Sequence, residues 1–547
     1  MNGSITRRRI MAALGVGSVG VTAQVLAACG ESTPTVVTKE VPVEKIVIKE
    51  VPVEKVVEKV VVKEVPVEKV VIKTETQIKE VPVDKIVVKT ETVVKEVPVD
   101  KIVIKEVPKI VEKTIVKEVE VVKEAAPAAA ATTPIRFMNY WAAGTRWETM
   151  KAGLEEFDKR HPNIQYKLEK LPPGFYRDKV NIMFAAGTIG DVLVLNGARM
   201  REFSSMLLTL NDLLGPANIN IEDYLILARE YPDKVDTENL SVGPALKGMP
   251  FMSAVNGWVY NVDKFEADGV GNPGADATWD SQLEDGKKMS NPDTNHYGFH
   301  NGTGGEFRWL PLISANGGWL FSDKKRPATS SGFNTKGGQE AFQWYVDLAY
   351  KHEVSVPLGE IPSLLFEGVT KPFATGKIGM EPGGIHGPGG RKLRVGGRFT
   401  WDNMPSPKSP IGEVRFSTNE LGHFISHRAE DHGTVESSMT LISFIAGEYF
   451  QGLVADGRGA IPMFRSVINS DRYLGFQPGM PKSMDLIRDN FLSPDLYGLH
   501  FFDGWAQWWN MLHDEMTPAI TGEMDAMEAM ANAAAACDKH LRSLQAE

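Results

Sequence analysis

The sequence predicts an α/β protein whose folded body begins near residue 135 and is divided into two lobes, with a long extended segment before it. The first observation is that short apolar segments alternate with amphipathic ones after residue 135, and strands alternating with helices indicate α/β layers. The second is length, because the body runs to residue 547 and exceeds what one hydrophobic core normally supports. The third is a Val-Pro-Glu-Lys repeat over residues 30–124, which differs in composition from the body.

The body opens with a strand, a helix and a second strand. IRFMNYW, from residue 135, is a short apolar-rich strand. In the next segment Trp147, Met150, Leu154 and Phe157 recur at helical spacing until Pro162. NIQYKLEKL then alternates as a strand does, YRDKVNIMFAAG predicts a second helix, and DVLVLNG is a continuous apolar run suited to a buried strand.

Residues 1–28 have the three parts of an export signal. Three arginines at positions 7–9 precede an apolar run, and small residues precede Cys29. The run is shorter than the roughly 20 apolar residues that cross a bilayer. TRRRIM resembles a twin-arginine export signal, and LAAC resembles a bacterial lipobox, in which the cysteine is lipidated. We therefore expect an extracytoplasmic protein, at the cell surface or in the periplasm, anchored to the membrane by a lipid on Cys29.

Residues 29–134 contain the predicted lipid site, the repeat and an Ala/Pro linker. The repeat has Val-Pro pairs with prolines at positions 42, 52, 66, 82, 98 and 108. This uneven spacing does not suit a solenoid. A coiled coil is the main alternative, but the spacings break the heptad register and each internal proline costs a helix about 3 kcal/mol. Proline also favours an extended conformation in the valine before it. We expect an extended stalk solubilised by lysine and glutamate, disordered or with local β pairing.

Composition and motifs exclude several classes of protein. Two cysteines cannot form a disulfide framework if Cys29 is lipidated, and a net charge of −10 argues against nucleic acid as the partner. Histidines at positions 423, 427 and 432 lack the HExxH pattern of a zinc site. No segment pairs two carboxylates as a glycosidase requires, and no serine stands in a Gly-x-Ser-x-Gly elbow. The sequence predicts no catalytic residue, metal or cofactor.

Five segments of the body, in order, resemble a known family. They are FYRDKVNIMFAAGTIGDVLVLNG, KGMPFMSAVNGWVYNVDKFEADGV, ATWDSQLEDGKKM, PFATGKIGM and GRGAIPMFRSV. Together they resemble the family 1 extracellular solute-binding proteins, the large sugar-binding type that feeds ABC transporters, although Gly190 stands where proline is usual.

The resemblance implies a periplasmic-binding-protein-like type II fold, with two α/β lobes joined by a three-crossing hinge. The crossings are expected near Phe251–Val255, Ser417–Gly422 and Gly459–Met463. The N-terminal lobe would then comprise residues 135–252 and 421–459, and the C-terminal lobe residues 253–420 and 460–547. The resemblance further implies a binding protein, not an enzyme, which closes on its ligand by hinge motion and delivers it to ABC transporter permease subunits.

The implied ligand is a sugar or oligosaccharide in the cleft between the lobes. The flat apolar faces of a sugar pack on aromatic rings, and its hydroxyls need polar partners. All eleven tryptophans lie in the body, and a core position is the alternative for each of them. Matching segments to the family gives the candidate ligand-binding residues Trp141, Asn196, Asn256, Trp258, Phe307, Arg308, Trp309, His386, Asn419, Arg465 and Trp505.

One departure from the family keeps alternatives open. His386 stands where sugar binders of this type commonly have tryptophan. Arg308, Arg465 and a protonated His386 would suit a sugar phosphate or another anionic solute, and a polyol is a further alternative. The remaining alternative to a binding protein is an enzyme that degrades glycans at the cell surface.

Overall fold

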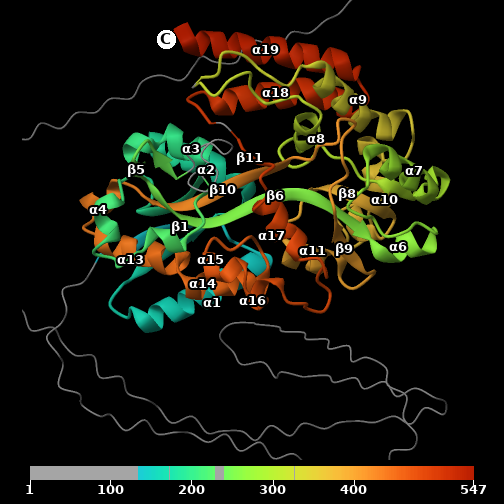
Figure 1. Ribbon diagram of the computed structural model, residues 1–547. Coiled ribbons are helices and arrows are strands. Elements are labelled where there is room, and N and C mark those ends of the chain that lie inside the picture. The colour runs from blue at the N-terminus through green and yellow to red at the C-terminus, as the bar shows by residue number, and fades with distance from the viewer. Residues whose placement is uncertain (1–132, 172, 228–239, 326, 500, 547) are drawn as a thin grey trace, which may run out of the picture. The chain divides into compact units, whose positions relative to one another are not determined.

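The computed structural model describes residues 133–171, 173–227, 240–325, 327–499 and 501–546 (Figure 1). The predicted export signal, the lipid site and the repeat lie outside these residues. Within the described ranges, no helix combines the length and the hydropathy that a membrane span requires.

The first five elements confirm the predicted order of strands and helices. They are β1 (Ile135–Asn139), α1 (Gly144–Arg160), β2 (Tyr166–Lys170), α2 (Pro173–Ala185) and β3 (Val192–Asn196). Helix α1 buries Met150, Leu154 and Phe157 on one face, as their spacing predicts, and ends just before Pro162. Strand β3 is buried over nearly its whole length, as its unbroken apolar run predicts.

A mixed sheet runs through the body. Its strands follow the order β2-β1-β3-β10-β6-β8-β7, with β11 beside β10 and β9 beside β6. The later strands are β6 (Gly248–Asn261), β7 (Tyr297–Phe299), β8 (Ile378–Gly384), β9 (Trp401–Met404), β10 (Phe416–Ile425) and β11 (Leu496–Gly498). Strands β4 (Ser241–Val242) and β5 (Ala245–Leu246) form a separate hairpin.

Helices cover both faces of this sheet. The remaining ones are α3 (Gly197–Glu202), α4 (Asn211–Leu214), α6 (Val262–Ala267), α7 (Trp279–Met289), α8 (Trp309–Ala315), α9 (Lys336–Tyr350), α10 (Ile361–Leu364), α11 (Pro388–Val395), α12 (Arg428–Asp431), α13 (Val435–Ala446), α14 (Glu448–Gly457), α15 (Arg465–Ile468), α16 (Asp471–Leu474), α17 (Asp485–Phe491), α18 (Trp505–Ile520) and α19 (Ala526–Ala546). Figure 1 shows α18 and α19 together above α8, and α1 and α14 on the opposite side of the sheet.

Strand β6 is buried along all of its 14 residues. Because it is so long, it pairs with two different groups of strands. Its first part, Gly248–Val255, pairs with β10, and its second part, from Asn256, pairs with β8 and β9. Alternate side chains of the second part enter different cores. Trp258 and Tyr260 belong to the core that contains residues of α8, α9, α18 and α19, whereas Val259 belongs to the core that contains residues of α16 and α17. A third core surrounds β1, β3 and the first part of β6.

Three chain segments meet at Ser253, near the middle of β6. The hydroxyl of Ser253 lies 3.1 Å from that of Thr418 on β10, and the backbone N–H of Ile461 donates to the Ser253 carbonyl at 3.4 Å. These segments are the ones in which the sequence places the three crossings.

Candidate ligand-binding site

A loop before α8, Gly304–Arg308, forms one wall of a cavity of about 290 Å³. The other walls are Gly383 and Gly384 at the end of β8, and Trp509 and His513 on α18. This volume is close to the lower limit of the roughly 300–1,000 Å³ that small-molecule sites occupy. The loop needs glycine at Gly305, where a Cβ atom would lie 2.6 Å from the Trp309 ring.

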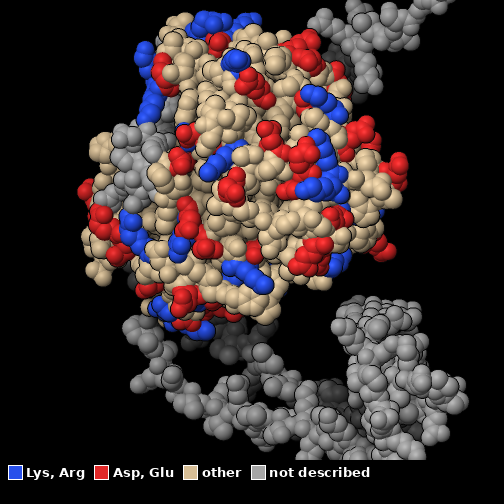
Figure 2. All heavy atoms as spheres, turned by 45° about the vertical axis from the view of Figure 1, so that its right-hand side comes forward, with Lys and Arg blue, Asp and Glu red and all other residues tan. Residues whose placement is uncertain are grey.

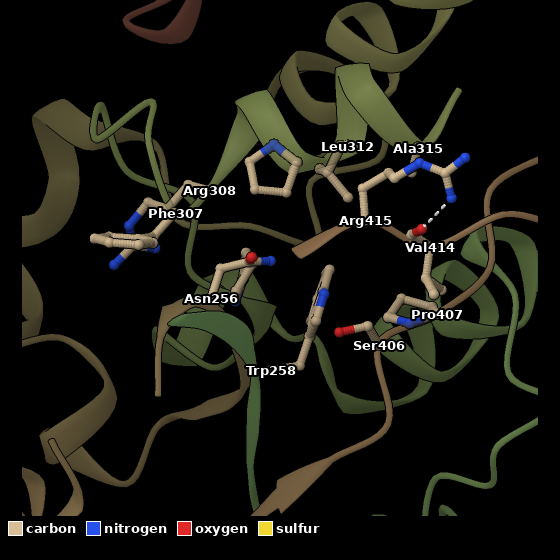
Figure 3. A pocket seen from close by; sticks show the side chains of 12 residues that line it. Asn256, Trp258, Phe307, Arg308, Leu312, Ala315, Ser406, Pro407, Val414 and Arg415 are labelled. Carbon is tan, nitrogen blue, oxygen red and sulfur yellow. Dashed lines mark hydrogen bonds between the residues drawn. The ribbon is translucent and has the colours of Figure 1, made fainter. Parts of the chain in front are cut away.

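A second hollow adjoins the first at Phe307 and Arg308, and it is much smaller, with a volume of about 10 Å³ (Figure 3). Figure 3 shows Asn256 and Trp258 between Phe307 and Arg308 on one side and Arg415 on the other. The Asn256 Oδ1 atom accepts a 2.5 Å hydrogen bond from the Ser417 N–H, which fixes this amide in place. The hollow has room for about one water molecule, so the larger cavity is the candidate ligand site.

Arg308 reaches both hollows and is held by a buried carboxylate. Its Nη1 donates to the His300 carbonyl at 3.1 Å, and its Nη2 lies 3.3 Å from Glu381 Oε1. Glu381 also accepts from His300 Nδ1 at 2.8 Å and lies 3.7 Å from Arg391 Nη2. Burial acts to raise the pKa of Glu381, but the charge of Arg308 and the contacts with His300 and Arg391 outweigh it and hold that pKa far below its usual range.

His386 lies against the Phe307 ring, with centroids 5.6 Å apart. Burial, together with the charge of Arg146, lowers the pKa of His386 to about 3, so the ring is neutral at neutral pH. The alternative of an anionic ligand held by a protonated His386 is therefore disfavoured, because burial and the nearby charge of Arg146 both oppose protonation of the ring. The charge of Arg308 is already balanced by Glu381. These two observations weigh against an anionic ligand.

The predicted tryptophans lie mostly in cores. Trp141 donates from Nε1 to Met252 Sδ at 3.2 Å and packs on Phe251, and Trp309 donates to the Thr303 carbonyl at 3.1 Å. Trp258 is buried and borders the small hollow only. Trp505 is 6% exposed and stacks on both Trp508 and Trp509.

The predicted polar residues divide between the site and other surroundings. Asn196 caps α3 by accepting a hydrogen bond from the Arg199 N–H at 3.2 Å, and Arg465 donates to the Glu222 carbonyl at 2.7 Å. Neither residue lines either of the two hollows. Asn419 lies on β10, and its Oδ1 is buried without a hydrogen-bond partner in the described part of the chain.

Apart from its glycines, the cavity is lined by three residues outside the candidate set: Glu306, His513 and Trp509, the last of which belongs to the tryptophan cluster of α18 that supplied the candidate Trp505. Trp505 and Trp509 are four residues apart and share one face of α18, so the sequence predicts the face but not which ring borders the cavity. The ring of His513 lies 4.7 Å from that of Trp509, and burial lowers its pKa.

The three histidines considered as metal ligands have separate partners. His423 is buried between Phe137 and Phe251, His427 contacts Glu430, and His432 Nδ1 lies 2.6 Å from Asp191. Among the described residues, no group of three or more histidine, cysteine or acidic side chains could hold a metal ion.

Solved structures similar to this chain include sugar-binding proteins, some of them with a sugar bound. An ABC substrate-binding protein from Listeria monocytogenes in complex with cycloalternan has a TM-score of 0.64 and 17% identity, covering 76% of this chain and 99% of that one. Maltose-bound MalE3 from T. maritima has a TM-score of 0.61 and 20% identity, covering 75% and 99%. The cyclic alpha-maltosyl-1,6-maltose binding protein from Arthrobacter globiformis has a TM-score of 0.58 and 17% identity, covering 75% and 100%. At these identities the similarity shows the fold, and it confirms the expected periplasmic-binding-protein-like type II architecture.

Sequence comparisons give the family. No curated protein matches the sequence. The family model for bacterial extracellular solute-binding proteins matches residues 143–419, just over half of the 547 residues. The chain therefore belongs to the family of bacterial extracellular solute-binding proteins.

Proposed function

We propose that this protein captures a sugar or oligosaccharide outside the cytoplasm and delivers it to the permease subunits of an ABC importer. The observation that carries the proposal is the cavity lined by Phe307, Arg308 and Trp509, which offers aromatic faces beside fixed polar groups. The ligands named for the similar structures, cycloalternan, maltose and a cyclic maltosyl-maltose, are all carbohydrates.

The proposal includes the two lobes and their hinge. The first lobe comprises residues 135–252 and 421–459, and the second comprises residues 253–420 and 460–547. The meeting of β6, β10 and the segment near Ile461 at Ser253 supports a hinge there, because bending at a few adjoining positions lets packed lobes move as units. No chemical step is needed for capture, so we propose a binding protein, not an enzyme.

A sugar panel tests this function. The purified chain is expected to show a higher melting temperature with one or more of maltose, maltotriose and cycloalternan, because a ligand at 100 times its Kd adds about 2.7 kcal/mol to the native state. Sugar phosphates and polyols are included in the same panel, because they represent the alternative ligands that the sequence leaves open. The sugar should be recovered unchanged after incubation. A response to sugar phosphates alone would contradict the proposal, and a hydrolysed sugar would favour the enzyme alternative.

We also propose that a lipid on Cys29 anchors the protein to the membrane. A thioether lipid requires the cysteine thiol, so Cys29→Ser is expected to give a protein that is either soluble or still carries its export signal. Cell fractionation with mass spectrometry of the N-terminus measures this. A variant that loses its signal and still partitions with membranes would contradict the lipid anchor.

A further inference from the structure

Glu306 places a carboxyl group at the edge of the cavity, and one oxygen of this group has no hydrogen-bond partner among the described residues. Its backbone carbonyl accepts from the Ser417 hydroxyl, which ties the loop to the start of β10. Its Oε1 is buried and has no hydrogen-bond partner among the described residues, and the same holds for Oδ1 of Asn419. The Asn419 side chain hydrogen-bonds to the Glu306 carboxyl and favours its charged form. Two buried acceptors therefore stand together without donors, at a cavity that Glu306 lines.

The titratable and charged groups around Glu306 come from several elements. Arg308 is two residues along the same loop, and His513 on α18 lines the same cavity. Tyr497 on β11 is within electrostatic range of the carboxyl, and Arg415, just before β10, is within range of Tyr497.

None of these groups supplies a free positive charge to the carboxyl. Arg308 is bound to Glu381, and Arg415 contacts two carboxylates. Burial lowers the pKa of His513, which stays neutral, and burial raises the pKa of Tyr497, which stays protonated. Burial also raises the pKa of Glu306 to about 7, against the hydrogen bond from Asn419.

We propose that Glu306 and Asn419 form a hydroxyl-binding pair of the ligand site, and that binding of a neutral polyhydroxylated ligand releases the proton of Glu306 to solvent. Without ligand, the protonated carboxyl avoids a buried charge that the hydrogen bond from Asn419 does not offset. Ligand hydroxyls that donate to the carboxylate favour its charged form, so the O–H bond of Glu306 breaks and the proton leaves. This inference deepens the proposed function and rests on it.

The sign of the pH dependence follows from this coupling. Below about pH 7 binding must remove a proton, so affinity is expected to fall by up to about tenfold for each pH unit below that value. Above it the carboxyl is already charged, and affinity is expected to level off. A site without this coupling would show no such change.

The test is calorimetric titration of the full chain with maltotriose and with cycloalternan between pH 5.5 and 8.5. At pH 6.5 the binding heat should differ between two buffers of different ionisation enthalpy, which measures proton release without any substitution. Glu306→Gln cannot ionise, so it should bind with a pH-independent Kd and release no proton. Glu340→Gln, at an exposed ion pair on α9, is the matched control and should behave as the wild type.

A second readout needs no sugar. Because the folded pKa of Glu306 lies above its usual value of 4.5, its contribution to stability is fully present below that value and is lost as the pH rises through about 7. The wild-type chain should therefore lose stability relative to Glu306→Gln over this range. Saturable sugar binding with equal heats in both buffers and equal Kd at pH 6 and pH 8 would overturn the inference alone. No binding of either of these sugars or of maltose at any pH would overturn the proposed sugar function as well.

Discussion

Replacing Glu381 by leucine is expected to lower the free energy of unfolding by about 3–5 kcal/mol. The carboxylate is the shared partner of Arg308, Arg391 and His300, at distances of 2.8–3.7 Å, and its side chain is only 12% exposed. Removing it leaves two guanidinium groups close together in a buried place without their counter-charge. Denaturant unfolding at pH 7, with the slope compared between variants, measures the change.

The pH dependence of the wild-type chain provides a second check on Glu381. Its folded pKa lies below the usual value of 4.5, so its stabilisation is present above that value and is lost as the pH falls toward the folded pKa. This acid loss should be smaller in Glu381→Leu. Asp456→Asn, at an exposed pair with Arg472, is the control and should have little effect. Equal stability of the Glu381 variant and the wild type would show that the carboxylate does not organise this cluster.

Substitution of Trp509 and of Trp505 by alanine is expected to give opposite results. Trp509 lines the cavity and is partly exposed, so Trp509→Ala should weaken sugar binding by at least about 1 kcal/mol, roughly the contribution of a good aromatic contact. Trp505 is buried among Phe321, Phe501 and Phe502, so Trp505→Ala should cost about 3–5 kcal/mol of stability. Titration calorimetry and denaturant unfolding of both variants measure the two quantities.

The contrast between these rings is the informative part of the experiment. If Trp509→Ala binds the sugar normally while Trp505→Ala remains stable and loses binding, the sugar packs on the Trp505 ring and not on the Trp509 ring. If both variants lose stability and both bind normally, the proposal that a tryptophan ring of α18 packs against the sugar is wrong.

Local periodicity was sufficient to predict the first elements of the body. The spacing of Met150, Leu154 and Phe157 predicts α1, and the unbroken apolar run of residues 192–195 predicts the buried strand β3. The division into lobes could be expected only through the resemblance to the family. Strand β6 is one continuous segment of 14 residues, and nothing in its local sequence shows that its two parts pair with different strands.

The site was predicted only in part, because its properties depend on long-range contacts. Phe307 and Arg308 were expected and do line the cavity, and both come from one short loop. The ionisation of His386 depends on its burial and on Arg146, far away in the sequence. In the sequence Glu306 is one acidic residue among many, and only the fold shows that it is buried and interacts with Asn419 and Tyr497. Figure 2 shows acidic and basic side chains mixed over the visible face, so surface charge alone would not have revealed the site.

Hydrogen exchange with and without sugar tests the central claim most directly, namely that the ligand binds between the loop 304–308, the end of β8 and α18. The sugar used is the one that raises the melting temperature most in the panel. We predict slower exchange at residues 304–308, at Gly383 and Gly384, and around Trp509 and His513 in α18. We also predict slower exchange near Ser253, where the proposed hinge lies. Protection confined to another surface, with these segments unchanged at saturating sugar, would contradict the account.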